Sequence, residues 1–252
     1  MPEVQTQSFL GSTTNTYFLG DNQVILNPFE QPPIPLDGLV AWYDGSNLAS
    51  YPGSGSTWYD ISPSTGSGTL VGSPTFNSTT KLFTFNGSSQ RVDLTQIYPA
   101  GQSTYTYYCV VSAATGGTTQ VFGQATESNN RRALMIRFGT GYGFNGYNND
   151  INQPAGMGVA NNLLKGVALS MNTAGGSNAA RFYLNGTFIV AGNTSNLAAN
   201  LNMGTTARIA SNAGNTELFN GSIGVCIAYN RVLTDAEIAQ INTYYATKYT
   251  LV

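Results

Sequence analysis

The stretch 219-FNGSIGVCIAYNRVLTDAEI-238 joins a strand-like run to the start of a helix. Its SIGVCIAYN segment is rich in β-branched residues, which favour a strand. Thr234-Asp235-Ala236-Glu237 then matches a capping box, the pattern that begins a helix. Ile238, Ile241 and Tyr245 follow on one face. The chain is therefore predicted to end in a strand followed by one short helix.

The sequence before this stretch consists of short alternating runs separated by Gly, Asn, Ser and Pro. In 181-RFYLNGTFIV-190, Asn185-Gly186 supplies the positive φ angles of a tight hairpin turn. About a dozen such runs predict an antiparallel β-sandwich, a mainly β fold. Its core is predicted to include Trp42, Phe85, Phe182, Leu184, Ile223, Val225 and Ile227.

Residues 1–35 differ from the sandwich of residues 36–252. They repeat Phe-Leu-Gly and end in the stiff connector 28-PFEQPPIP-35, predicted to hold the sandwich away from an attachment surface. One or two short strands cannot fold alone, so this N-terminal arm is expected to pair with the sheet edge of a partner. The arm residues expected to mediate assembly are Phe9, Leu10, Phe18, Leu19, Val24, Ile25 and Leu26.

Composition restricts the partners. Charged residues make up only 9% of the chain and the net charge is −2, against a usual charged fraction of about 25%. Nucleic-acid binding, which requires clustered Lys and Arg, is not expected. No apolar run is long enough to span a membrane and no basic-then-apolar pattern occurs at the start, so neither a membrane span nor a signal peptide is expected. Cys109 and Cys226 are interpreted as buried thiols, with one inter-strand bridge as the alternative.

Two Trp-Tyr-Asp repeats, at Trp42-Tyr43-Asp44 and Trp58-Tyr59-Asp60, suggest either catalytic acids beside sugar platforms or scaffold. Neighbouring residues of a strand point to opposite faces, so only one aromatic of each pair can face a groove. Both acids precede turn-like sequence, where a carboxylate accepts hydrogen bonds from backbone N–H groups. The structural interpretation is favoured.

Catalytic and metal-binding patterns are sparse. The chain has no histidine, which removes Ser-His-Asp and Cys-His arrangements. Its twelve acids are scattered singly, unlike the close carboxylate pair of a retaining glycosidase. We therefore predict no enzyme, no cofactor and no metal site. Calcium held by Asp93, Asp150 and Glu217 is the less favoured alternative.

One loop, 139-GTGYGFNGYNNDINQ-153, has the composition of a sugar-binding edge, where rings stack and amides donate hydrogen bonds. The candidate glycan-binding residues are Tyr142, Phe144, Asn145, Tyr147 and Asn148. The favoured alternative is a glycine-rich hairpin whose aromatic rings face the core or a neighbouring subunit.

Three segments in this order, Phe85-Asn86-Gly87, Tyr183-Leu184-Asn185-Gly186 and residues 219–238, carry a family resemblance. Over about residues 36–250 the chain resembles the laminin-G-like, concanavalin A-like jelly-roll domains of secreted proteins and tailed-phage structural proteins. The family usually has Asp where this chain has Asn86 and Asn185, which makes a calcium site of the family type less expected.

The resemblance implies a non-enzymatic structural protein on the surface of a phage virion, as capsid decoration or as a tail or fibre component. Its expected partners are other virion proteins and copies of itself. The alternative is a glycan-binding adhesion module that recognises host-surface carbohydrate, with or without calcium.

Overall fold

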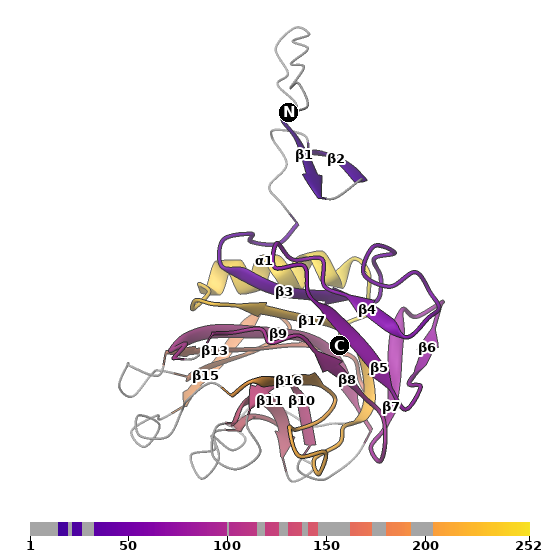
Figure 1. Ribbon diagram of the computed structural model, residues 1–252. Coiled ribbons are helices and arrows are strands. Elements are labelled where there is room, and N and C mark those ends of the chain that lie inside the picture. Colours follow the sequence, from indigo (N-terminus) through magenta and orange to yellow (C-terminus); the bar gives the residue numbers. More distant parts are fainter. Residues whose placement is uncertain are drawn as a thin grey trace, which may run out of the picture.

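The computed structural model describes residues 15–19, 22–26, 33–99, 101–114, 119–125, 131–137, 141–145, 162–172, 180–192 and 204–252. Within these ranges the fold is two large antiparallel sheets packed face to face, with one helix (Figure 1). The predicted mainly β sandwich is confirmed.

In the described part of the chain, one sheet has seven strands. Their order is β12 (Gly141–Asn145), β11 (Arg131–Arg137), β10 (Thr119–Ala125), β16 (Thr206–Ile209), β8 (Arg91–Leu94), β5 (Ser67–Val71) and β4 (Thr57–Tyr59). We call this the seven-stranded sheet.

The second large sheet has eight strands among the described residues. Their order is β15 (Thr187–Gly192), β14 (Ala180–Leu184), β13 (Lys165–Asn172), β9 (Thr104–Ala113), β17 (Asn220–Tyr229), β7 (Leu82–Asn86) and β6 (Thr75–Asn77), with β3 (Leu39–Asp44) also paired to β17. We call this the eight-stranded sheet.

The strand predicted at the end of the chain, β17, is central to the eight-stranded sheet. It pairs with β9 along one side, and its other side is shared by β7 and β3. Cys226 lies directly opposite Cys109 in this register, and their sulfur atoms are 3.7 Å apart. Both cysteines are free and buried, as the favoured interpretation predicted.

Both faces of the eight-stranded sheet are covered. Phe182 faces the core between the two sheets, whereas the next residue, Tyr183, faces a second apolar layer beneath helix α1 (Asp235–Ala246). The alternation follows from the two-residue period of a strand. Of the predicted core residues, Leu184 is half-buried, because it ends β14 beside the turn. The other six are buried: Trp42, Phe85, Phe182, Ile223, Val225 and Ile227.

The helix begins where the capping box predicts. The Thr234 side chain accepts a hydrogen bond from the Glu237 backbone, and the Glu237 carboxylate accepts one from the Thr234 backbone. Ile238, Ile241 and Tyr245 are the buried residues of α1. Among the described residues, no helix is both long and apolar enough to cross a membrane.

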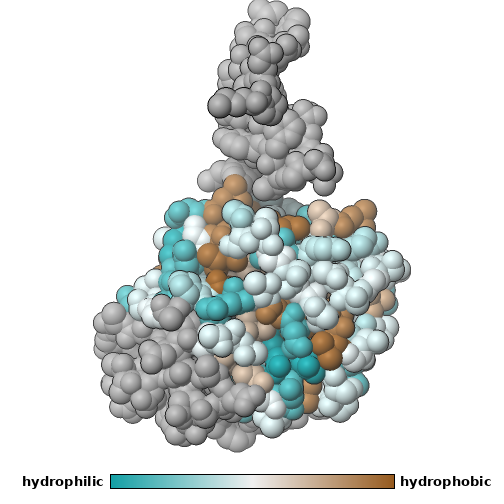
Figure 2. All heavy atoms as spheres, in the orientation of Figure 1, coloured by the Kyte–Doolittle hydropathy of each residue, from teal (hydrophilic) through white to brown (hydrophobic). Residues whose placement is uncertain are grey.

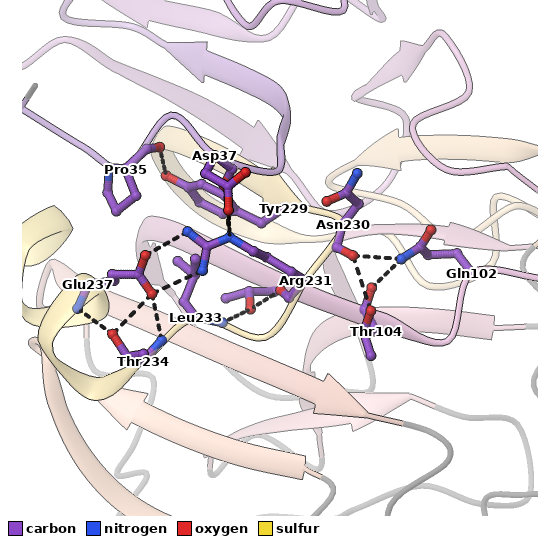
Figure 3. A network of polar contacts seen from close by, with 11 residues as sticks. Pro35, Asp37, Gln102, Thr104, Tyr229, Asn230, Arg231, Leu233, Thr234 and Glu237 are labelled. Atoms are coloured by element: carbon purple, nitrogen blue, oxygen red, sulfur yellow. Dashed lines mark hydrogen bonds and ion pairs between the residues drawn. The ribbon is translucent and has the colours of Figure 1, made fainter.

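The last residues of the predicted arm pack against the sandwich. Ile34 is fully buried in the layer beneath α1, and the Tyr229 hydroxyl donates a 3.0 Å hydrogen bond to the Pro35 carbonyl (Figure 3). Arg231 forms ion pairs with both Asp37 and Glu237. The proline-rich connector was predicted to hold the sandwich at a distance. Residues 34 and 35 instead belong to its packing.

The arm also contains a hairpin. β1 (Asn15–Leu19) and β2 (Asn22–Leu26) pair antiparallel in a two-stranded sheet of their own. The predicted assembly residues Phe18 and Leu19 lie in β1, and Val24, Ile25 and Leu26 lie in β2. Phe9 and Leu10 lie outside the described residues.

Candidate functional site

The first Trp-Tyr-Asp repeat lies on β3 and is buried. Trp42 faces the layer under α1, and Tyr43 faces the core between the sheets. Asp44 is fully buried, and its Oδ1 accepts hydrogen bonds from the backbone and hydroxyl of Ser46 at 2.8 and 2.6 Å. Burial raises the pKa of Asp44. Its carboxylate fixes the turn after β3, as the structural interpretation predicted.

The second repeat lies on β4. Trp58 is fully buried in the core, and Asp60 Oδ1 accepts hydrogen bonds from the backbone N–H groups of Trp42 and Ser62, both at 2.8 Å. This carboxylate therefore ties the end of β4 to β3. Tyr59 alternates to the opposite face and is 49% exposed, which leaves it as the one accessible ring of the two repeats.

The first candidate residue of the predicted sugar-binding loop, Tyr142, is not available to bind a sugar. Tyr142, on β12, is 1% exposed and belongs to the core between the sheets, so its ring has no outer surface on which a sugar could stack. Phe144 and Asn145 are the last two residues of β12. Tyr147 and Asn148 lie outside the described residues.

The acids considered for calcium are not gathered together. Asp93 is paired with Arg91 and Arg208, and Glu217 accepts a 3.3 Å hydrogen bond from the Gln120 side chain. Asp150 lies outside the described residues. In the part of the chain that the structure describes, no group of three acidic, cysteine or histidine side chains is placed to hold a metal ion.

The two sheets differ in what covers their outer faces. Helix α1 covers the eight-stranded sheet on the side away from β8 and β16 (Figure 1). On β4, β5 and β8 of the other sheet, outward residues are exposed or half-buried, and the residues between them, such as Trp58 and Val92, point into the core. We call this outer surface the open face. It consists of Thr57, Tyr59, Ser67, Thr69, Arg91, Asp93 and Arg208.

Strand register places these residues in a row. Thr57 lies opposite Thr69, Thr69 opposite Asp93, and Asp93 opposite Arg208. The next position beyond Arg208 is Gly123 on β10, which has no side chain. The row therefore runs from hydroxyl groups at the edge strand to a charged cluster near the middle of the sheet.

Neutral polar side chains dominate the visible surface. Outside the grey residues, Figure 2 shows a face that is largely pale, with separate hydrophilic and hydrophobic patches, as expected for a chain in which 9% of residues are charged. Such a surface offers hydrogen-bond donors and acceptors with little long-range field.

The sequence matches a known family in its central and C-terminal part. Residues 86–239 match the concanavalin A-like lectin/glucanases superfamily. The chain belongs to this superfamily. The jelly-roll resemblance found in the sequence is thereby confirmed, whereas the phage context has no support from it. No curated protein sequence matches the chain.

Solved structures with a similar fold are distant from this chain in sequence. Trypanosoma rangeli sialidase in complex with sialic acid matches with a TM-score of 0.60 and 17% identity, over 86% of this chain and 34% of the sialidase. The binding domain of botulinum neurotoxin DC in complex with rat synaptotagmin II matches with a TM-score of 0.60 and 13% identity, over 82% of this chain and 51% of the toxin domain. The chain thus spans about a third of the sialidase.

The prediction that the chain is not an enzyme is corrected by these likenesses, because the matching structures include sialidases. Sialidases use a tyrosine nucleophile, so the absence of histidine and of a carboxylate pair does not exclude glycoside chemistry. At 17% identity the likeness shows the shared fold and assigns no reaction to this chain.

Proposed function

We propose that the sandwich is a recognition module that binds carbohydrate on the open face, and that the N-terminal hairpin attaches it to a larger particle. The observation that carries the proposal is Tyr59. It exposes 49% of its surface beside the exposed hydroxyl residues Ser67 and Thr69. An exposed ring provides a stacking surface for the apolar face of a sugar, and hydroxyl groups both donate and accept hydrogen bonds.

The comparisons support a binding role of this kind. A sialidase that shares the fold over about a third of its chain forms a complex with sialic acid, and a neurotoxin binding domain that shares it over about half forms one with synaptotagmin. Host-surface glycans are therefore the proposed ligands. The 139–153 loop remains a second candidate for contact with them through Tyr147 and Asn148.

The hairpin supports the attachment role. Two strands alone are marginally stable in water, and β1 and β2 pair with each other in a sheet separate from the sandwich. Addition of this hairpin to a partner's sheet edge would complete its backbone hydrogen bonding. The larger particle proposed is a phage virion, with the module as capsid decoration or as a tail or fibre component.

A glycan array probed with the full chain tests the binding proposal. We expect Tyr59→Ala to reduce binding by about fivefold or more, because ring stacking contributes on the order of 1–3 kcal/mol. Phe188→Ala is the matched control, since Phe188 is an exposed ring, at 38%, on the eight-stranded sheet. Tyr147→Ala tests whether the 139–153 loop contacts the glycan. A parallel measurement with a chelator tests whether binding requires calcium. Equal binding by wild type and Tyr59→Ala would contradict the open face as the site.

A further inference from the structure

The open face carries a charged cluster whose composition differs from the other arginine clusters. Arg91 forms two hydrogen bonds with Asp93, at 2.9 and 3.1 Å, and Arg208 Nε lies 2.8 Å from the same carboxylate. Two guanidinium groups therefore share one acid, which leaves a net charge of about +1 at this point of the face.

The other arginine ion pairs among the described side chains have no such excess. Arg181 is paired with Asp235 alone, and Arg231 lies between Asp37 and Glu237. These sites are respectively neutral and negative. Positive charge in the described arginine clusters is thus concentrated on the open face, although the whole chain has a net charge of −2.

The segment that follows β16 fixes the Arg208 side chain by hydrogen bonds. Its Nη1 donates to the carbonyls of Asn212 and Ala213 and to the Asn215 side chain, at 2.7, 2.6 and 2.8 Å. Its Nη2, like Nη1 of Arg91, makes no hydrogen bond to the described residues. A guanidinium that is fixed at one nitrogen and unsatisfied at another can bind a carboxylate with little loss of side-chain freedom.

We propose that Arg91 and Arg208 bind the carboxylate of an acidic sugar within a glycan that lies along the open face. This inference rests on the proposed function and specifies its ligand class. Tyr59 and Asp93 are separated by two strand spacings of about 4.8 Å and two residue rises of about 3.3 Å, which places them on the order of 12 Å apart. The ring and the guanidinium groups therefore contact different sugars of one chain.

The test compares one acidic oligosaccharide with its carboxyl-reduced form, in which each carboxylate has become a primary alcohol. By calorimetry at low ionic strength, we expect wild type to bind the acidic form at least about tenfold more tightly. Raising the salt concentration should reduce this preference, because the cluster is partly exposed and is screened.

Variants distinguish a cluster that recognises the ligand carboxylate from one in which the Arg91–Asp93 ion pair only stabilises the fold. Arg91→Gln should lose the preference for the acidic form, so that its affinities for the acidic and the reduced form differ by less than about twofold. Arg181→Gln, on the other sheet, is the matched control and should retain the preference. Asp93→Asn, which raises the local positive charge, should bind the acidic form at least as tightly as wild type even where its melting temperature falls.

Three outcomes overturn the inference, and they are distinguishable. Equal wild-type affinity for the acidic and reduced forms would leave carbohydrate binding in place and refute the carboxylate site. No binding of either form, nor of any arrayed glycan, would refute the proposed function as well. A preference retained in Arg91→Gln would place the acidic contact elsewhere.

Discussion

The indole N–H of Trp42 on β3 donates a 2.7 Å hydrogen bond to the hydroxyl of Tyr245 on α1. That hydroxyl in turn lies 3.2 Å from Asp44 Oδ2 and donates to it. One buried phenol therefore links the helix at the end of the chain to the first strand of the sandwich. These two hydrogen bonds, together with apolar packing, hold α1 against the eight-stranded sheet.

Tyr245→Phe should destabilise the fold. It leaves the Trp42 indole N–H without an acceptor and removes a donor from the buried Asp44 carboxylate, which together cost about 1–3 kcal/mol. Urea denaturation of the variant measures the loss. Tyr244→Phe is the control, because the neighbouring Tyr244 hydroxyl makes no such pair of hydrogen bonds to the described residues, and it should change stability by less than about 0.5 kcal/mol. Equal losses in the two variants would contradict the linking role.

Phe182→Ala should cost about 3–5 kcal/mol of unfolding free energy, because a fully buried ring leaves a cavity. Phe188→Ala, three positions beyond the turn-forming Asn185 and 38% exposed, should cost much less. A loss below about 1 kcal/mol for Phe182→Ala would show that the faces of β14 are assigned the wrong way round.

Stability should depend on the titration of Glu237. Hydrogen bonds from Arg231, followed by those from the Thr234 cap, lower the pKa of Glu237 from 4.5 to about 2. A carboxyl group whose pKa is lowered in the folded state stabilises the fold above its unfolded pKa, and this contribution is lost as pH falls from about 4.5 toward 2. Melting temperatures across this range should fall less steeply for Glu237→Gln than for wild type. An unchanged slope would contradict the contribution.

Because the last residues of the arm, 34 and 35, pack against the sandwich, we can predict which N-terminal truncations the fold tolerates. A chain that begins at Pro33 should keep the stability of the full sandwich. One that begins at Leu36 loses buried Ile34 and the Pro35 carbonyl that accepts from Tyr229. Loss of a buried isoleucine costs about 2–5 kcal/mol, so the shorter chain should unfold at lower urea concentration. Identical midpoints would show that residues 33–35 contribute nothing to the sandwich.

Local signals made much of the fold predictable from the sequence. The capping box located the helix, Asn185-Gly186 located the hairpin, and the β-branched run SIGVCIAYN located β17. These features depend on residues close together in the chain. The docking of Ile34 was missed because proline-rich segments favour extended chain whether or not they pack against a domain.

The candidate site was less predictable. Arg91 and Arg208 meet only because β8 and β16 pair in a particular register, and strands far apart in sequence carry no local signal of their pairing. Tyr142 was chosen for its glycine-rich surroundings, yet its strand position turns it into the core. Tyr59 was recognised as part of a repeat, and alternation with buried Trp58 was the available signal for its exposure.

The most direct test of the central claim is to map a bound glycan by NMR. Amide shifts are followed while the isotope-labelled full chain is titrated with its strongest array ligand. We predict that the largest changes fall on Thr57 to Tyr59, Ser67 to Thr69 and Arg91 to Asp93, the strands of the open face. Changes confined to α1, to the eight-stranded sheet or to the 139–153 loop would contradict the account.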